Sequence, residues 1–308
     1  MLDSLTGFVV VGAAIFVGYI IGRVDLLGSH ARPVLSRLTF FVLSPFLLFS
    51  VLSDADVRTL FSALLPVSAI AAVVMFALYA AIARFVWHRS IGETLIGALS
   101  SGQVNSNNIG IPLSVYLLGS AAYPAPVILL QLLIFTPISM TVLESIVSGR
   151  ASLWRSLRRT LSNPIVIGSA LGTLVSVLGI ELPPVVHDPV TLIANACVPI
   201  LLISYGISLH GQRVLGASGG RRRDVLLAST LKLIAMPLVA WVFAEFVFGL
   251  GRPDVLIVVV LAALPTAHNI FNYSQRYDIG ETISRDTVFM TTMGCLPVLL
   301  LATILLGP

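Results

Sequence analysis

The chain has 308 residues, of which 57% are hydrophobic and 10% are charged, and its mean hydropathy is +1.00. A soluble domain carries about a quarter charged residues, so a water-soluble fold could not cover this much apolar surface. The composition excludes an ordinary soluble protein and indicates an integral membrane protein. The formal net charge of +4 comes almost entirely from arginines in short stretches between apolar runs, since Lys232 is the single lysine. Such charges indicate membrane orientation and argue against nucleic acid as a partner.

Apolar runs of roughly 20 residues, the length that crosses the hydrocarbon core, occur about ten times. The first run follows an N-terminus without the basic segment of a cleaved signal peptide, so we expect it to remain as a transmembrane helix. The fourth and ninth runs are unusually polar in the middle. The predicted spans, in chain order, are residues 5–22, 34–53, 60–84, 91–118, 124–147, 164–180, 189–210, 225–249, 254–277 and 282–306.

The arginines lie mostly on one side of this predicted topology. The opposite loops hold Arg58 and Arg252. The positive-inside rule therefore predicts a multi-pass protein of the cytoplasmic (inner) membrane, with both termini on the extracytoplasmic side. The loops that follow the odd-numbered spans hold Arg23, Arg32, Arg84, Arg89, Arg150, Arg155, Arg158, Arg159, Arg213, Arg221, Arg222, Arg223, Arg276 and Arg285.

A basic cytoplasmic linker, residues 151–163, divides the chain into residues 1–150 and 164–308. Each part holds five predicted spans, and an odd number means that the second part enters the membrane from the opposite face. These features predict two inverted five-helix repeats, an architecture typical of secondary transporters. Similar short runs occur in the same order in both parts, at residues 21–26 and 178–182, 45–50 and 199–204, and 98–101 and 263–266.

The fourth and ninth spans are predicted to be discontinuous helices. Residues 100–112 hold three asparagines, a glutamine, two glycines and a proline, and residues 265–275 are polar in the same way. Glycine and proline weaken a helix locally, and the freed backbone groups need side chains, water or a ligand. Each break exposes a half-helix N-terminus with about half an elementary positive charge. Two such ends with asparagine donors predict an anion site, whereas kinked helices joined by asparagines are the simpler alternative.

Other polar residues within the spans carry weaker signals. Gln131 is predicted either to face the same cavity or to form an interhelical hydrogen bond. His268 is the one histidine deep within a span, and both proton coupling and neutral packing are open to it. Lys232, together with Glu144 and Glu245, is expected to snorkel to the membrane surface. No catalytic motif or nucleotide-binding loop is present, so we expect no enzyme activity, no cofactor and no metal site.

Several motifs together resemble the auxin efflux carrier family. Residues 105–113 resemble its N-x-x-x-[IM]-G-I-P-L signature, and the resemblance extends over nearly the whole chain. The family includes plant PIN-type carriers and bacterial malonate or malate permeases. The PIN-type carriers have a second proline after the position of Pro265 and a long cytoplasmic loop between the halves, and this sequence has neither. These differences indicate a short prokaryotic member and argue against auxin itself as the substrate. Further matching positions are Gln131, Glu144 and Arg150 in the fifth span, residues 197–202 and 206–209 in the seventh, and residues 263–265 in the ninth.

The resemblance implies an all-α membrane fold in which helices 4 and 9 cross at their unwound centres in mid-membrane. It also implies a scaffold of helices 1, 2, 6 and 7, a mobile core of helices 3–5 and 8–10, and alternating access of small organic anions at the crossover. The expected partners are such an anion and the lipid bilayer, with a homodimer left open. The residues carried over as substrate-binding are Asn105, Asn108, Gly110, Ile111, Pro112, Gln131, Pro265, His268 and Asn269.

Two alternatives remain open at this point. A sodium-coupled symporter of the bile-acid type has the same architecture, and Ser101, Gly102, Ser106 and Asn107 are similar to its fourth-helix pattern. That family uses an acidic residue in the ninth helix, which this chain lacks. A membrane sensor that binds without transporting is the other alternative, although no signalling segment is evident.

Overall fold

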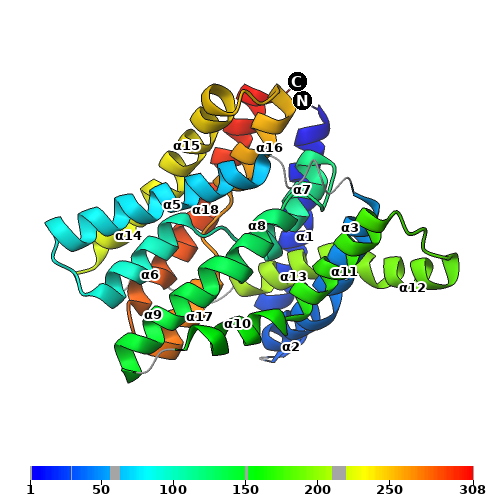
Figure 1. Ribbon diagram of the computed structural model, residues 1–308. Helices are drawn as coiled ribbons and strands as arrows, with labels where there is room; N and C mark the ends of the chain where they lie inside the picture. Colours follow the sequence, from blue (N-terminus) through cyan, green and yellow to red (C-terminus); the bar gives the residue numbers. More distant parts are fainter. Residues whose placement is uncertain (1, 29, 56–62, 150–151, 210–219, 308) are drawn as a thin grey trace. The chain divides into compact units, whose positions relative to one another are not determined.

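The computed structural model describes residues 2–28, 30–55, 63–149, 152–209 and 220–307. These residues are almost entirely helical, and their one extended pairing is an isolated backbone bridge (Figure 1). The predicted all-helical membrane fold is confirmed at this level, since six helical segments of the described chain are long and apolar enough to cross a membrane. They are Pro33–Asp54, Leu64–Val86, Ala125–Val147, Pro184–Ile207, Arg222–Val247 and Glu281–Leu306, and shorter apolar helices are Val9–Arg23 and Pro164–Leu178.

The fourth and ninth predicted spans are the two that match no single apolar helix. The fourth is divided into α6 (Ile91–Gly102), the π-helical η3 (Ser106–Gly110) and α7 (Ile111–Leu118). The ninth is divided into α16 (Arg252–Ala263) and α17 (Asn269–Tyr277). Both interruptions agree with the sequence, whereas the count of ten membrane-crossing segments stays a prediction. Three arginines of the orientation argument, Arg58, Arg150 and Arg213, lie outside the described residues, as does residue 151 of the linker.

The chain forms two compact units, and each draws segments from both parts of the sequence. The first comprises Met1–Phe61, Asn107–Leu129 and Arg158–Gln212, and the second comprises Ser62–Ser106, Leu130–Leu157 and Arg213–Pro308. The first unit therefore contains the predicted spans 1, 2, 6 and 7 that the resemblance assigns to a scaffold. It also contains residues 107–129, which the resemblance assigned to the core. The division into repeats at residues 151–163 is a different one and stays a prediction.

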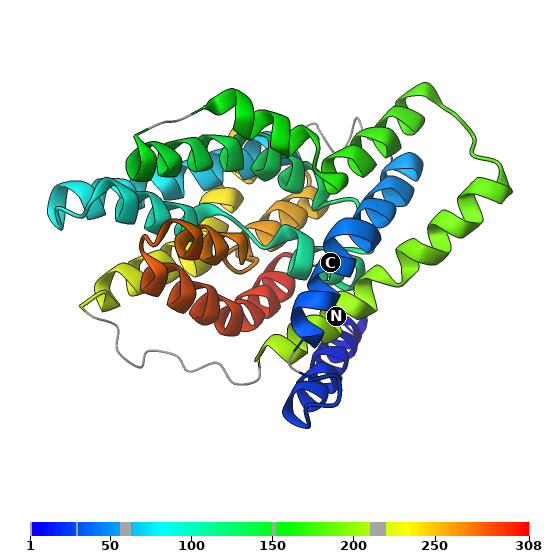
Figure 2. The same cartoon turned by 90° about the horizontal axis from the view of Figure 1, so that it is seen from below.

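In the first unit two helix pairs pack closely through glycine. α1 lies against α13, where Gly18 meets the backbone of Ile203, and α3 lies against α11 (Figures 1 and 2). Small residues allow this backbone approach between membrane helices. The helices of this unit are α1 (Leu2–Arg23), α2 (Ala31–Leu38), η1 (Thr39–Leu43), α3 (Ser44–Asp54), α7, α11 (Pro164–Leu178), α12 (Pro184–Asn195) and α13 (Cys197–Leu209).

Replacing Gly172 by alanine is expected to weaken the α3–α11 pair. A Cβ atom there would lie 2.5 Å from the carbonyl oxygen of Phe49, so the two backbones would have to separate at a cost of about 1–3 kcal/mol. Thermal unfolding of the purified protein in detergent measures this effect. Gly12→Ala is the matched control, because nothing lies within 4 Å of the position that a Cβ atom would take there; equal melting temperatures for the two variants would contradict the account.

The second unit surrounds α6 and α16, which are each 12 residues long and mostly buried. α6 packs against α5, α14 and α18, and α16 packs against α5, α15 and α18. Its helices further include α5 (Leu64–Ala81), η2 (Ile82–Val86), η4 (Gln131–Phe135), α9 (Thr136–Ser148), α14 (Arg222–Thr230), η5 (Leu231–Ala235), α15 (Met236–Val242), η6 (Phe243–Val247), α17 and α18 (Glu281–Leu306). Along the chain, α8 (Ala125–Leu130) and α10 (Leu153–Leu161) each run across a boundary between the two units.

The helices that precede α6 and α16 end in the same way. α5 continues into the π-helical η2, and α15 continues into the π-helical η6. The amide of Trp87 donates to the carbonyl of Ile82, and the amide of Phe248 donates to that of Phe243. Extended residues then lead into α6 and α16, so the two interrupted helices enter the second unit through equivalent turns.

Candidate functional site

The break in the fourth span begins where the end of α6 packs closely against α5. α6 ends at Gly102, and a Cβ atom there would lie 2.8 Å from the carbonyl oxygen of Ala72 on α5. Glycine is therefore required at the contact, and it is also a residue that destabilises the helix interior. Gln103 has extended backbone angles, and helical structure resumes at Ser106. The backbone groups of the intervening residues need partners outside a helix.

The break in the ninth span has a different local cause. α16 ends at Ala263, and Leu264 is extended, as expected for a residue before Pro265. Proline cannot donate a backbone hydrogen bond and disfavours a continuing helix. α17 begins at Asn269, so residues 264–268 form the interruption.

The two interruptions meet in an antiparallel backbone bridge between Val104 and Thr266. The amide of Asn105 donates to the carbonyl of Pro265 at 2.8 Å, and the amide of Ala267 donates to the carbonyl of Gln103 at 3.1 Å. All these residues belong to the second unit and are buried. The bridge gives the extended residues of both breaks the partners that their helices no longer supply.

Gln131 holds the outer edge of the bridge on the side of Val104. Its Oε1 accepts from the Val104 amide at 2.9 Å, and its Nε2 donates to the Val104 carbonyl at 3.1 Å. Nε2 also lies 3.3 Å from the Ser106 hydroxyl. The interhelical hydrogen bond, one of the two roles open to Gln131 from the sequence, is therefore the one observed.

Thr291 has the corresponding role on the side of Thr266. Its hydroxyl accepts from the Thr266 amide at 3.0 Å, and the Thr266 hydroxyl donates to the carbonyl of Ser100 in the last turn of α6 at 2.6 Å. Thr291 lies 25 residues after Thr266, and Gln131 lies 27 residues after Val104. Sequence reasoning missed Thr266 and Thr291, although reading the predicted repeat forward from Gln131 would have pointed to this part of α18.

Lys232 lies near the same crossover and corrects a prediction. Its side chain is fully buried, and Nζ donates to the carbonyl of Ala262 at 2.6 Å. Ala262 is in the last turn of α16, where carbonyls lack a helical partner and carry partial negative charge. The expected snorkelling to the surface is therefore wrong, because Lys232 faces the packed helices of the second unit. Glu144 is half-buried, 3.8 Å from Arg155, and Glu245 is exposed.

The structure brings together three of the predicted site residues, which are Asn105, Gln131 and Pro265. His268 is half-buried, with its ring edge-on to Phe271 at 5.9 Å, and the exposed Asn269 begins α17 directly after the bridge. These five residues belong to the second unit.

The other four predicted residues belong to the first unit, and their part in the site stays a prediction. Asn108 accepts from the Asn107 side chain at 3.1 Å. Gly110 precedes α7, while the buried Ile111 and Pro112 form its first turn. Proline in a first helical turn costs no backbone bond, which fits the restart of the helix after the break.

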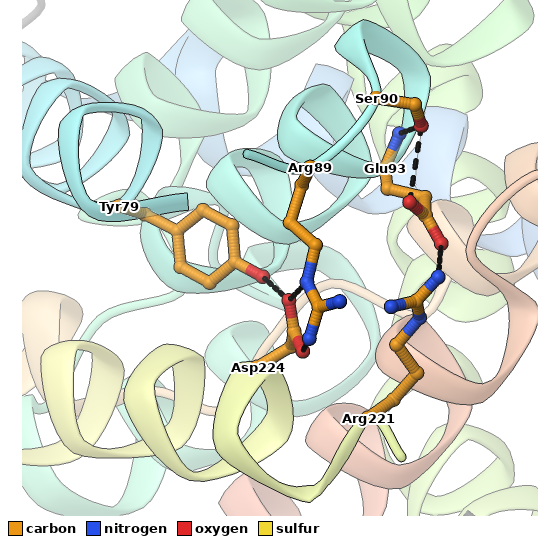
Figure 3. A network of polar contacts seen from close by, with 6 residues as sticks. All are labelled: Tyr79, Arg89, Ser90, Glu93, Arg221 and Asp224. Carbon is orange, nitrogen blue, oxygen red and sulfur yellow. Dashed lines mark hydrogen bonds and ion pairs between the residues drawn. The ribbon is translucent and has the colours of Figure 1, made fainter. Parts of the chain in front are cut away.

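A polar network joins the loop-side ends of α5, α6 and α14 (Figure 3). Arg89 pairs with the buried Asp224 through two hydrogen bonds of 3.0 and 2.6 Å, and the Tyr79 hydroxyl lies 3.4 Å from the same carboxylate. The bond to Asp224 raises the pKa of the Arg89 guanidinium. Arg221 pairs with Glu93, which also contacts Ser90. Arg89 and Arg221 were predicted as orientation charges, and they also hold these helices together.

Comparison with known proteins decides the family. A model of the family described as membrane transport protein matches residues 5–152 and 146–303. The chain belongs to this family. It is a multi-pass membrane protein of a transporter family, and the resemblance to auxin efflux carriers is confirmed by its relatives.

The relatives include bacterial, archaeal and plant proteins. A "Putative malonate transporter" of Rhizobium meliloti (strain 1021) is 24% identical over 91% of this chain and 88% of its own length. An "Uncharacterized transporter" of Methanothermobacter thermautotrophicus is 25% identical over 91% of this chain and 90% of its own length. A "Probable auxin efflux carrier component 9" of Oryza sativa subsp. japonica is 28% identical over 50% of this chain. The match spans 37% of that plant protein.

Proposed function

We propose that the protein is a secondary transporter that moves small organic anions across the cytoplasmic membrane by alternating access at the crossover. The observation that carries the proposal is the bridge between Val104 and Thr266, at which two interrupted helices meet. Discontinuous helices that meet inside a membrane protein are the usual substrate sites of secondary transporters. Extended backbone within the hydrocarbon region of the membrane is tolerated only where it is buried in protein or lines a cavity.

The charge around the crossover favours an anion. α17 begins directly after the bridge, and a helix N-terminus carries about half an elementary positive charge. Lys232 adds an amine on the other side of the break, and no ion pair joins it to a carboxylate within the described chain. Asn105 and His268 are polar side chains next to the bridge. The relative described as a malonate transporter makes dicarboxylates the first substrate class to test.

An inverted repeat is part of the proposal, and matching contacts in the two sequence parts support it. α1 packs on α13 and α11 packs on α3, so the first helix of each part lies against the second helix of the other. Both pairs use glycine at the contact. The turns before α6 and α16 have the same hydrogen bonds, and Gln131 and Thr291 hold the two edges of the bridge. With residues 1–150 and 164–308 as the repeats, both termini are proposed to lie on the extracytoplasmic side.

A thermal-shift panel on the purified protein tests the proposal. Mono- and dicarboxylates are added in sodium and in potassium buffer, and a ligand at a hundredfold excess over its Kd should stabilise the fold by ~2.7 kcal/mol. We expect a dicarboxylate to raise the melting temperature equally in both buffers. A shift that requires sodium would favour the bile-acid type of symporter instead, and no shift with any carboxylate would overturn the proposed substrate class.

Asn105→Ala is expected to reduce the ligand-induced stabilisation by about half or more while the protein still folds. The substitution takes away a buried amide side chain beside the bridge but keeps the backbone bond to Pro265. Loss of one ligand hydrogen bond lowers affinity about tenfold or more. The matched control is Asn272→Ala, because Asn272 is an exposed asparagine of α17 in the same unit. Equal shifts in the Asn105→Ala and control proteins would count against a site at the crossover.

A further inference from the structure

Lys232 is the single lysine of the chain and has no exposed surface. It lies in the π-helical η5, where its Nζ donates to the carbonyl of Ala262 at 2.6 Å and lies 3.3 Å from the sulfur of Met236. An ammonium group without water or a counter-ion is costly to bury. Ionisable residues at such positions in membrane spans commonly mark ion or proton pathways, and π-helical segments are frequent at functional sites.

No carboxylate of the neighbouring elements forms an ion pair with Lys232 among the described residues. The Cys295 thiol on α18 is the titratable group that interacts electrostatically with Lys232. Asp224, Tyr79 and Glu93 belong to the polar network in Figure 3. The titratable and charged side chains of the elements packed against η5 are Tyr79 on α5, Glu93 on α6, Arg222, Arg223 and Asp224 on α14, Arg252 and Asp254 on α16, and Glu281, Arg285, Asp286 and Cys295 on α18.

A buried polar face leads from the loop-side end of α18 toward Lys232. Thr287, Thr291 and Cys295 are spaced four residues apart, so they share one face of α18, and all three are buried. The Thr287 hydroxyl and Oδ2 of the adjacent Asp286 have no hydrogen-bond partner among the described residues. Asp286 uses its other carboxylate oxygen to bind Arg285 at 2.8 Å.

α14, which continues into η5, also holds a buried polar group. Ser229 on α14 lies three residues before Lys232, and its hydroxyl is buried without a hydrogen-bond partner in the described chain. α14 and η5 both pack against α18. Buried hydroxyl and carboxylate groups of this kind bind internal water, and water next to such groups conducts protons.

We propose that Lys232 is the proton-carrying group of the transporter and that protons reach it along the buried polar face of α14 and α18. On release, one N–H bond of the ammonium breaks, its electron pair stays on Nζ, and the proton passes to water on the side of the membrane to which the site is open. On uptake, the amine takes a proton from water through the groups around Ser229, Thr287 and Asp286.

The proton on Lys232 acts on the substrate site through α16. Ala262 lies four residues before Thr266, the ninth-span residue of the bridge. A charged ammonium stabilises the partly negative end of α16, whereas a neutral amine does so less. The proposal rests on the proposed function only for the coupling to an anion; proton exchange at Lys232 is a property of the chain itself.

The chain offers a direct test because it has one lysine. Protein labelled with ¹³C and ¹⁵N in lysine, prepared without a lysine-containing tag, gives one side-chain resonance by nuclear magnetic resonance. We expect this resonance to move between its ammonium and amine positions within the pH range in which the protein stays folded. We also expect a bound dicarboxylate to change that titration. A resonance that keeps one form over the whole range would overturn the proposal, whether or not the protein transports an anion.

Flux in proteoliposomes tests the coupling. Wild-type protein is expected to move protons together with a dicarboxylate, read with a trapped pH dye and a radiolabelled substrate. Lys232→Arg keeps the positive charge but does not release its proton, so it should lose the proton movement. Proton movement at the wild-type ratio in Lys232→Arg would overturn the proposal. Carboxylate flux without protons in the wild type would overturn it too and leave the proposed function standing.

Discussion

Gln131→Ala is expected to abolish transport and to lower the free energy of unfolding by about 1–3 kcal/mol. The substitution leaves the amide of Val104 buried without its partner, and such a group costs about 1–3 kcal/mol. The Val104 carbonyl loses its bond to Gln131 but still accepts from the Ser106 amide at 2.8 Å. The crossover should then lose its fixed geometry, since Val104 is the fourth-span residue of the bridge. Denaturant titration in detergent measures the stability, and carboxylate flux in proteoliposomes measures the transport.

Gln275→Ala is the control for this prediction, because Gln275 is an exposed glutamine of α17 in the same unit. It should change stability by no more than about 0.5 kcal/mol. Thr291→Val examines the other edge of the bridge by removing the acceptor of the Thr266 amide. If Gln131→Ala unfolded at the same denaturant concentration as its control, the role of Gln131 in holding the break would be refuted.

Asp224→Asn is expected to destabilise the second unit by about 3–5 kcal/mol, because it breaks a buried ion pair from one side. The Asp224 side chain is fully buried, and its two carboxylate oxygens accept two hydrogen bonds from Arg89 and one from Tyr79. Removing the carboxylate charge leaves the guanidinium without its partner at the ends of α5, α6 and α14 (Figure 3). The melting temperature of the purified variant measures the loss.

Arg89→Gln and the double variant complete a cycle that isolates the pair energy. The side chain of Arg89 is 21% exposed and that of Asp224 is fully buried. Arg89→Gln leaves the buried carboxylate without its partner, so this single change should cost at least as much as Asp224→Asn. Asp278→Asn is the matched control, since Asp278 is exposed and its left-handed backbone suits asparagine equally well. Additive single and double effects would show that Arg89 and Asp224 do not interact.

Hydrophobic patterning predicted the helical segments closely, and glycine and proline predicted both breaks. The span predicted at 34–53 is Pro33–Asp54 in the structure, and the span predicted at 282–306 is Glu281–Leu306. The length of an apolar run can be read directly from the sequence, because it does not depend on how the helices pack. The interruptions are local as well: Gly102 ends α6 and Pro265 follows the end of α16.

The partners of the broken backbone were not visible in the sequence. Thr291 was missed because a threonine in a membrane helix usually bonds its own preceding turn, and Thr291 does so with the carbonyl of Thr287 at 2.7 Å. Its second role, as acceptor from Thr266, depends on how α18 is rotated against the bridge. For Lys232, distance from the end of a span suggested snorkelling, but rotation of the helix decided that it faces Ala262.

The pairing of Arg89 with Asp224 lies beyond what single-sequence reasoning can find, since 135 residues separate the two. Arg89 and Arg221 both lie in loops, so the sequence predicted the same role for both, which was membrane orientation. Which loop charge meets which carboxylate depends on the packing of α6 against α14. The same holds for the bridge, where hydrogen bonds join residues of the fourth and ninth spans.

Counterflow of a radiolabelled dicarboxylate such as malonate, in sodium-free proteoliposomes, tests the central claim most directly. Wild-type protein and the Asn272→Ala control should exchange external label for internal substrate, whereas Asn105→Ala should fall at least about tenfold while its melting temperature stays close to that of the control. That result would place transport of a small organic anion at the crossover of α6 and α16. Counterflow in Asn105→Ala at the wild-type rate, or none in the wild type with any carboxylate that stabilises it, would contradict the account.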